Sequence, residues 1–295
     1  MPRLSALEPL YAPPELRPLA VATLKAIATA RFASRMSLMA IAGPDGLTPD
    51  LLAVWTKAGL LHEGTVQLDP LSPITTTWYA LTTAGARELG LVTIGTVKGI
   101  STARLRRSGR KLAHDVLVGE CVLAVMALAK DGAIDLMGVE ADDTKLTMST
   151  VLPGPPPERV PLRPDALVMV RAERGPTAVL VEVDRGTISR DRMQQKYAGY
   201  LAWHGQGGPE RDWNVRALRI LTVVPSEARL KALHDAALAA NHARRSGLLL
   251  FALQRDVAAY HAERLLEPVA QSLGAAERVP IFESKNSRVA LALAG

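Results

Sequence analysis

The stretch AVLVEVDRGTISRDRMQQKYAGYLAW, residues 178–203, places two acids in an otherwise apolar strand and follows them with a helix. Alternation along a strand puts Glu182 and Asp184 on the same face, and Lys196 lies in the helix that follows. Because burying an unpaired charge is costly, a buried strand normally carries apolar residues at such positions. The stretch therefore predicts either a metal-binding site or an edge strand with one face in water.

Two further acids fit the first alternative. Asp165 begins the preceding strand, in LRPDALVMV, and a hairpin would bring it beside Glu182 and Asp184. Glu120 lies on the apolar stripe of a helix predicted over 113–132. Several converging carboxylates repel one another unless a cation lies between them, and oxygen ligands suit Mg²⁺ or Mn²⁺. The predicted metal ligands are Asp165, Glu182 and Asp184, with Lys196 as a catalytic cation and Glu120 as an additional site residue.

The same residues have a simpler interpretation. Glu182 and Asp184 could form ion pairs with Arg171, Arg185 or Arg190, and Glu120 could pair with Lys196 or an arginine. Such pairs would stabilise the fold and carry no chemistry.

Around this stretch the C-terminal half alternates between helices and strands. After the helix over 113–132 we expect a strand over 133–141, a proline-rich loop in STVLPGPPPERVPL, and a hairpin of DALVMVRAE and TAVLVEVD. A helix, the strand RALRILTVVP, a helix over 226–241, the strand SGLLLFALQ, a final helix and one or two short strands follow. This order predicts an α/β layered domain with a mixed sheet.

The N-terminal part has a different pattern, with helices predicted over 15–31, 34–42 and 49–58 and then two β-rich runs. This order, and TWYALTTAGARELG at 77–90, resemble a bacterial winged helix-turn-helix, in which the third helix enters the major groove. Thr48 is its expected N-cap and Pro49 its first residue. Leu51, Leu52 and Trp55 are expected in the core, and Thr48, Thr56 and Lys57 are expected to contact DNA. The alternative is a module that contacts protein only.

A basic run separates the two parts. It consists of Arg104, Arg106, Arg107, Arg110 and Lys111. These cations suit DNA phosphates, although a solvated linker has the same composition. The predicted organisation is a winged helix over 1–95, a basic linker over 96–112 and an α/β domain over 113–295.

The helix acid, the Pro164-Asp165 pair and Glu182 resemble the PD-(D/E)xK nuclease fold. That resemblance implies a metal-dependent endonuclease, but Asp184 stands where the family has lysine. Activity would then require Lys196 to replace that lysine.

A second resemblance covers nearly the whole chain. The winged helix, His114-Asp115, RPDA, VEVDRGT and KYAGY are similar to the bacterial replication-relaxation family, which is found largely on plasmids and other mobile elements. It implies a DNA-binding protein acting in replication, mobilisation (relaxation) or transcription control. An active Mg²⁺-dependent endonuclease or nickase and a protein-interaction scaffold are the alternatives.

Whole-chain properties agree with a polyanionic partner. The formal net charge is +6 and the sequence pI is about 9.6. The single cysteine excludes an internal disulfide framework. No signal peptide is recognisable, and we expect no apolar run to reach the roughly 20 residues of a membrane span. We expect a cytoplasmic protein that binds double-stranded DNA, without a membrane partner, and with a homodimer as one option for its assembly.

Overall fold

The computed structural model describes residues 17–43, 49–68, 74–93, 99–100, 105, 109–141, 146–152, 156–173, 175–240, 247–273 and 277–284. Contacts divide the chain into two compact units, Met1–Ala127 and Leu128–Gly295. Each unit combines helices with a sheet, and the larger sheet is mixed, so the predicted α+β class is confirmed.

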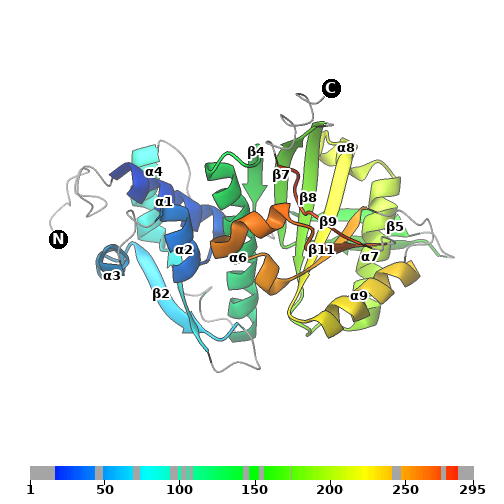
Figure 1. The fold of residues 1–295 in the computed structure, drawn as a ribbon, viewed down its shortest axis with the longest axis horizontal. Coiled ribbons are helices and arrows are strands. Elements are labelled where there is room, and N and C mark those ends of the chain that lie inside the picture. Colours follow the sequence, from blue (N-terminus) through cyan, green and yellow to red (C-terminus); the bar gives the residue numbers. More distant parts are fainter. Residues whose placement is uncertain are drawn as a thin grey trace. The chain divides into compact units, whose positions relative to one another are not determined.

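The first unit contains helices and a small sheet (Figure 1). Its elements are α1 (Arg17–Ala30), β1 (Ala33–Ser34), α2 (Arg35–Ala42), α3 (Pro49–Lys57), β2 (Leu61–Val66), β3 (Thr76–Leu81), α4 (Thr83–Thr93) and most of α6 (Gly109–Lys130). The three strands form an antiparallel sheet in the order β1-β3-β2. The predicted core residues Leu51, Leu52 and Trp55 of α3 are buried.

The beginning of α6 belongs to the core of the first unit. Ala113 and Val116 pack in a cluster with Phe32 and Trp78, whose rings meet edge to face with centroids 5.5 Å apart. The contact division at Ala127 therefore lies later than the domain boundary expected near residue 113. The physical reason is that α6 carries apolar side chains that are stabilised by burial against the aromatic residues of the first unit.

Length and apolar composition alone would allow α6 to cross a membrane, which departs from the expectation that no run is long enough. However, 72% of its most apolar window is buried inside the protein. Burial of this kind is typical of a core helix, so α6 is weak evidence for a membrane span.

The second unit is built on a seven-stranded sheet in the order β12-β11-β10-β9-β8-β7-β4. Its strands are β4 (Leu136–Glu140), β7 (Ala166–Ala172), β8 (Gly175–Val183), β9 (Ala217–Val224), β10 (Leu249–Leu253), β11 (Ala270–Ser272) and β12 (Arg278–Val279). Strands β8, β9 and β10 are parallel, and β7 pairs with β8 as the predicted antiparallel hairpin. Asp165 and Glu182 consequently lie at the same end of neighbouring strands.

Helices and two short 3₁₀ segments complete this unit together with a separate hairpin. The helical segments are α7 (Arg190–Gly205), α8 (Gly208–Trp213), α9 (Glu227–Ala240), η2 (Gln254–Asp256) and η3 (Ala259–Leu266). The final turn of α6 also belongs to this unit. Figure 1 shows α7 and α9 together beside the strands. Tyr197 and Tyr200 of α7 reach the sheet, whereas a side chain at Gly199 would meet Leu162 of the hairpin. Helix α7 therefore lies between the sheet and the hairpin.

That hairpin corrects one expectation. The segment predicted as a proline-rich loop forms β5 (Met148–Leu152) and β6 (Glu158–Leu162), which pair antiparallel. Pro161 lacks a backbone donor, which a two-stranded ribbon tolerates because one edge of each strand needs no partner. Leu162 and Met148 are buried in the main core of the unit, so the hairpin is held by apolar contacts.

Candidate functional site

The site begins with Glu182, which lies near the carboxyl end of β8 and is buried. Lys196 Nζ lies 2.5 Å from Glu182 Oε2 and also donates to the carbonyl of Arg163 at 3.1 Å. The hydroxyl of Tyr200 donates to Glu182 Oε1. Both oxygens of this buried carboxylate are therefore bonded to residues of α7. Lys196 thus contacts Glu182, with which the sequence analysis grouped it, whereas Tyr200 was not among the predicted site residues.

The electrostatic environment of Glu182 contains opposing influences. Burial raises the pKa of Glu182 to about 7, because the charged form loses its hydration. Lys196 and the hydroxyl of Tyr200 lower this pKa, whereas the charge of Asp165 raises it. The short contact with Lys196 favours the carboxylate, but burial outweighs it. Glu182 is consequently a titratable group near neutral pH.

Asp165 is fixed to the same strand end through the backbone. Its Oδ2 accepts the amide of Val183 at 2.8 Å, and its own amide donates to the carbonyl of Val181 at 2.9 Å. The hairpin of β7 and β8 places it there, and its charge acts on Glu182. The predicted proximity of Asp165, Glu182 and Lys196 is present in the structure.

Asp184 has a different partner. Its carboxylate accepts Arg229 Nε at 2.6 Å and Arg229 Nη2 at 3.2 Å, and its Oδ2 also accepts the amide of Gly186 at 3.0 Å. The Asp184 side chain is 1% exposed. Arg229 also donates to the carbonyl of Ile188 at 2.6 Å, so it joins α9 to the loop that follows β8. None of the three arginines considered from the sequence is this partner.

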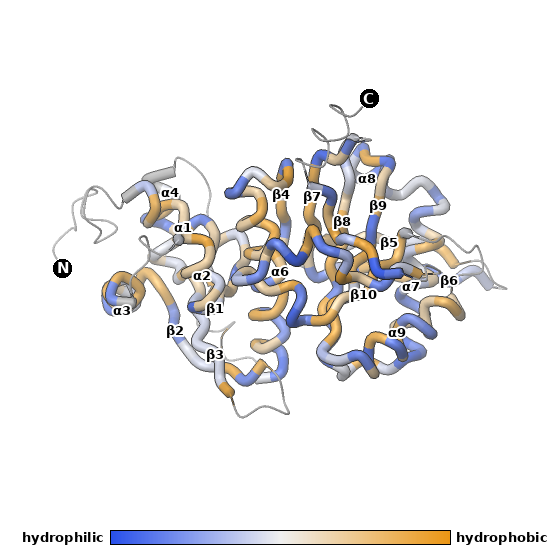
Figure 2. The backbone as a smooth tube through the Cα atoms, in the orientation of Figure 1, coloured by the Kyte–Doolittle hydropathy of each residue, from blue (hydrophilic) through white to orange (hydrophobic). Residues whose placement is uncertain are grey.

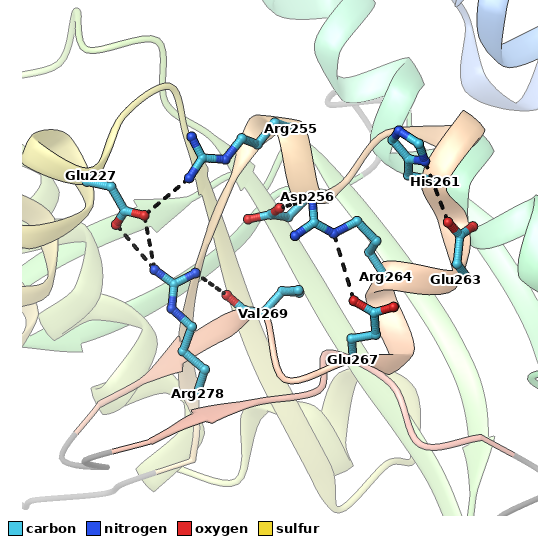
Figure 3. A network of polar contacts seen from close by, with 9 residues as sticks. All are labelled: Glu227, Arg255, Asp256, His261, Glu263, Arg264, Glu267, Val269 and Arg278. Atoms are coloured by element: carbon cyan, nitrogen blue, oxygen red, sulfur yellow. Dashed lines mark hydrogen bonds and ion pairs between the residues drawn. The ribbon is translucent and has the colours of Figure 1, made fainter.

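The start of α9, which carries Arg229, is held by a second network (Figure 3). Glu227 accepts Arg278 Nη2 at 3.1 and 3.3 Å and lies 3.5 Å from Arg255 Nη2. Arg278 also donates to the carbonyl of Val269 at 3.1 Å. These contacts join the first residue of α9 to β12 and to η2.

Glu120 was expected to join the strand acids, but its bonds lie within the first unit. The amide of Ser34 donates to its Oε1 at 3.0 Å, and the hydroxyl of Ser37 donates to its Oε2. Ser34 also caps α2 by accepting the amide of Ser37 at 3.1 Å. Burial raises the pKa of Glu120. Glu120 therefore serves as the buried acceptor that joins the start of α2 to α6.

These bonds decide whether the acids suit a divalent ion. Both oxygens of Glu182 and of Asp184 already accept protein donors, and the guanidinium of Arg229 already supplies a positive charge to Asp184. Within the described ranges, no group of three or more His, Cys, Asp or Glu side chains is placed to hold a metal ion. The structure thus pairs Asp184 with Arg229, and among the described residues Asp165, Glu182 and Asp184 do not form one such group.

The predicted DNA-contacting residues are only partly described. Thr48, Arg104, Arg106 and Arg107 lie outside the described residues. Lys57 and Arg110 are exposed, whereas Thr56 Oγ1 donates back to the carbonyl of Leu52 at 2.9 Å. Lys111 forms an ion pair with Asp115 at 2.8 Å.

Sequence reasoning missed Tyr200 and Arg229 for different reasons. Tyr200 follows Lys196 by four positions, so helical spacing puts both on one face of the helix. This spacing can be read from the sequence and could have identified Tyr200. Arg229 is 45 residues from Asp184 along the chain, and no sequence motif links the two residues. Only the parallel pairing of β8 with β9, which precedes α9, brings the two together.

The raised pKa of Glu182 gives a testable pH dependence. Protonated Glu182 contributes stability that is fully present below its unfolded pKa, near 4.5, and is lost as the pH rises through about 7. We expect the free energy of unfolding of Glu182→Gln to fall less between about pH 5 and 8 than that of the wild type, by up to roughly 3 kcal/mol. Urea unfolding at both pH values measures this difference. Glu120, whose pKa is also raised by burial, contributes equally to the pH dependence of both proteins. Parallel curves of unfolding free energy against pH for the two proteins would contradict the prediction.

A comparison with protein families gives one match. The family model described as replication-relaxation matches residues 16–218, which is more than half of the chain. The search of curated proteins and the search of solved structures found no match to this chain.

Proposed function

Because the chain belongs to the replication-relaxation family, which indicates a role in replication or relaxation, we propose that it is a double-stranded DNA-binding protein of a plasmid or other mobile element. The observation that carries the proposal is the order α1, β1, α2, α3, β2, β3 with an antiparallel β1-β3-β2 sheet. This is the order of a winged helix, whose third helix enters the major groove.

The exposed face of α3 indicates which kind of recognition to expect. Among its described side chains, Asp50, Ala53, Val54 and Lys57 are exposed, and Leu51, Leu52 and Trp55 face the core. Figure 2 shows α3 mostly in hydrophobic colours. One cation, one acid and two apolar side chains offer few donors or acceptors for base edges. We propose that affinity comes mainly from phosphate contacts, with weak sequence preference.

The α/β unit is proposed to act without cleaving DNA. Lys196 and Arg229 each neutralise an acid that a metal would otherwise need. The three groups that do converge, Asp165, Glu182 and Lys196, favour a nuclease as the second candidate. No catalytic step is assigned to them, because both oxygens of Glu182 and Oδ2 of Asp165 already accept hydrogen bonds within the protein.

Duplex binding is tested by fluorescence anisotropy with a labelled DNA duplex. We expect affinity to fall steeply between about 50 and 200 mM salt, as phosphate contacts release counterions. Lys57→Ala should weaken binding to different duplexes equally and lower the salt slope by about one. Lys25→Ala removes the same charge from an exposed position on α1 and serves as the matched control.

Two outcomes would redirect the proposal. If duplex is not bound even at low salt, a protein-interaction role for the first unit becomes the better explanation. If supercoiled plasmid is nicked with Mg²⁺ or Mn²⁺, and Asp165→Ala and Glu182→Ala abolish nicking, the second unit is a nuclease.

A further inference from the structure

A cavity of about 470 Å³ lies in the second unit between the β5–β6 hairpin and α8. Its lining residues are Leu146, Thr147, Met148, Ser149, Arg159, Arg211, Asp212 and Trp213. None of them belongs to the Glu182 site. The volume is within the usual range for small-molecule sites, and the lining combines two guanidinium groups with an indole and hydroxyls.

The wall formed by α8 is held in place from behind. The ring of Trp213 meets that of buried Trp203 edge to face, with centroids 5.1 Å apart. Trp203 Nε1 donates to Asp212 Oδ2 at 2.9 Å. A side chain at Gly208 would collide with the Trp203 ring, so the first residue of α8 fits closely against it. The position of Trp213 is therefore set before any ligand arrives.

The guanidinium of Arg211 is oriented by the same aspartate. Its Nε and Nη2 lie 2.8 and 3.1 Å from Asp212 Oδ1 and Oδ2. Asp212 thus uses its two oxygens on Arg211 and Trp203, and the half-exposed Arg211 retains donors for a ligand. With Arg159, the lining carries two cations and one acid, which favours an anion.

The opposite wall, β5, is fixed by the end of α7. Gln206 Nε2 donates to the carbonyl of Val151 at 2.9 Å, and Thr150 Oγ1 donates to Gln206 Oε1 at 3.0 Å. Arg159 stands on β6 directly opposite Val151. Both walls are thus tied to α7 or to its C-cap, Gln206.

We propose that this cavity binds a nucleotide of single-stranded nucleic acid, with the base against Trp213 and the phosphate between Arg159 and Arg211. An aromatic ring beside cations is the arrangement that holds unpaired bases without sequence preference. The inference rests on the proposed function that the chain acts on DNA. It assigns to the second unit the binding of single-stranded DNA, which replication or relaxation would expose. Duplex binding is assigned to the first unit and does not require this cavity.

The first test uses a fluorescein-labelled thymidine oligonucleotide of about twelve residues in an anisotropy titration. Arg159→Ala and Arg211→Ala should each weaken binding by roughly ten- to hundredfold, as expected for a charged hydrogen bond. Arg216→Ala removes the same charge at a position 89% exposed and outside the cavity, so it should change affinity less than about twofold. Equal affinities for all three variants would overturn the proposal.

The second test reads Trp213 directly. The other three tryptophans of the chain, Trp55, Trp78 and Trp203, are buried, so acrylamide quenching reports mainly on Trp213. The oligonucleotide should protect it from quenching. Trp213→Phe should retain most of the affinity, whereas Trp213→Leu should lose roughly five- to hundredfold through lost stacking. Unchanged quenching in the presence of saturating oligonucleotide contradicts base stacking here.

The two proposals fail separately. If Lys57→Ala weakens duplex binding while Arg159→Ala leaves single-strand binding unchanged, the cavity proposal is wrong and the duplex function stands. If single-strand binding depends on the cavity while duplex is not bound, the proposed duplex function is wrong and the cavity remains a nucleic-acid site.

Discussion

Replacing Arg229 with methionine is expected to lower the free energy of unfolding by about 3–5 kcal/mol. Asp184 is 1% exposed, and both of its oxygens accept this guanidinium at 2.6 and 3.2 Å. Methionine has a similar length but no donor, so a buried carboxylate would remain without its cation. The carbonyl of Ile188 would also lose its donor. Urea unfolding near pH 7, followed by circular dichroism, measures the loss.

Two further variants separate charge burial from simple truncation. Asp184→Asn combined with Arg229→Met removes both charges and should recover at least half of the loss, since the introduced amide oxygen could still accept the amide of Gly186. Arg216→Met breaks an ion pair with Glu210 whose side chains are 89% and 58% exposed, and should cost less than about 1 kcal/mol. A double variant less stable than Arg229→Met would show that the buried charge is not the cause.

Gly119→Ala is expected to destabilise the protein by roughly 1–3 kcal/mol, although alanine is the better helix former by about 1 kcal/mol. A Cβ atom at Gly119 would overlap the carbonyl oxygen of Phe32, which is a backbone atom and cannot rotate away. Displacing Phe32 would disturb β1 and the adjacent bond from the amide of Ser34 to Glu120. The midpoint of thermal unfolding should therefore fall.

The same helix supplies the control. Nothing lies within 4 Å of a Cβ atom built at Gly109, the first residue of α6. Gly109→Ala should therefore be neutral or slightly stabilising, because only the unfolded chain loses freedom. If Gly119→Ala raised the midpoint as Gly109→Ala does, the close approach of α6 to Phe32 would be refuted.

Several features of the fold were predictable because their signals are local. Pro49 begins α3 as expected, and the periodicity of that helix identified Leu51, Leu52 and Trp55 as buried. The apolar pattern of β8 identified the strand that carries Glu182, and the helix that follows brought Lys196 to this acid. Each of these inferences needed only neighbours within one or two elements.

Other features depended on partners that no local pattern identifies. Glu120 bonds serines 83 and 86 residues earlier, and Asp184 bonds an arginine 45 residues later. The β5–β6 hairpin was missed because its prolines indicate a loop, whereas buried Leu162 and Met148 stabilise it against the core of the second unit. Tertiary burial therefore outweighed local preference in that segment.

The sequence by itself determined the family, the mixed α+β class and the strand end at which Asp165, Glu182 and Lys196 meet. Only the tertiary structure decided what surrounds those acids. It placed Arg229 on Asp184 and bonded Tyr200 to Glu182, and among the described residues Asp165, Glu182 and Asp184 do not form a three-carboxylate group. The physical reason is that a buried carboxylate must be compensated, and either a metal or a protein cation can do so. Which of the two is present depends on long-range packing.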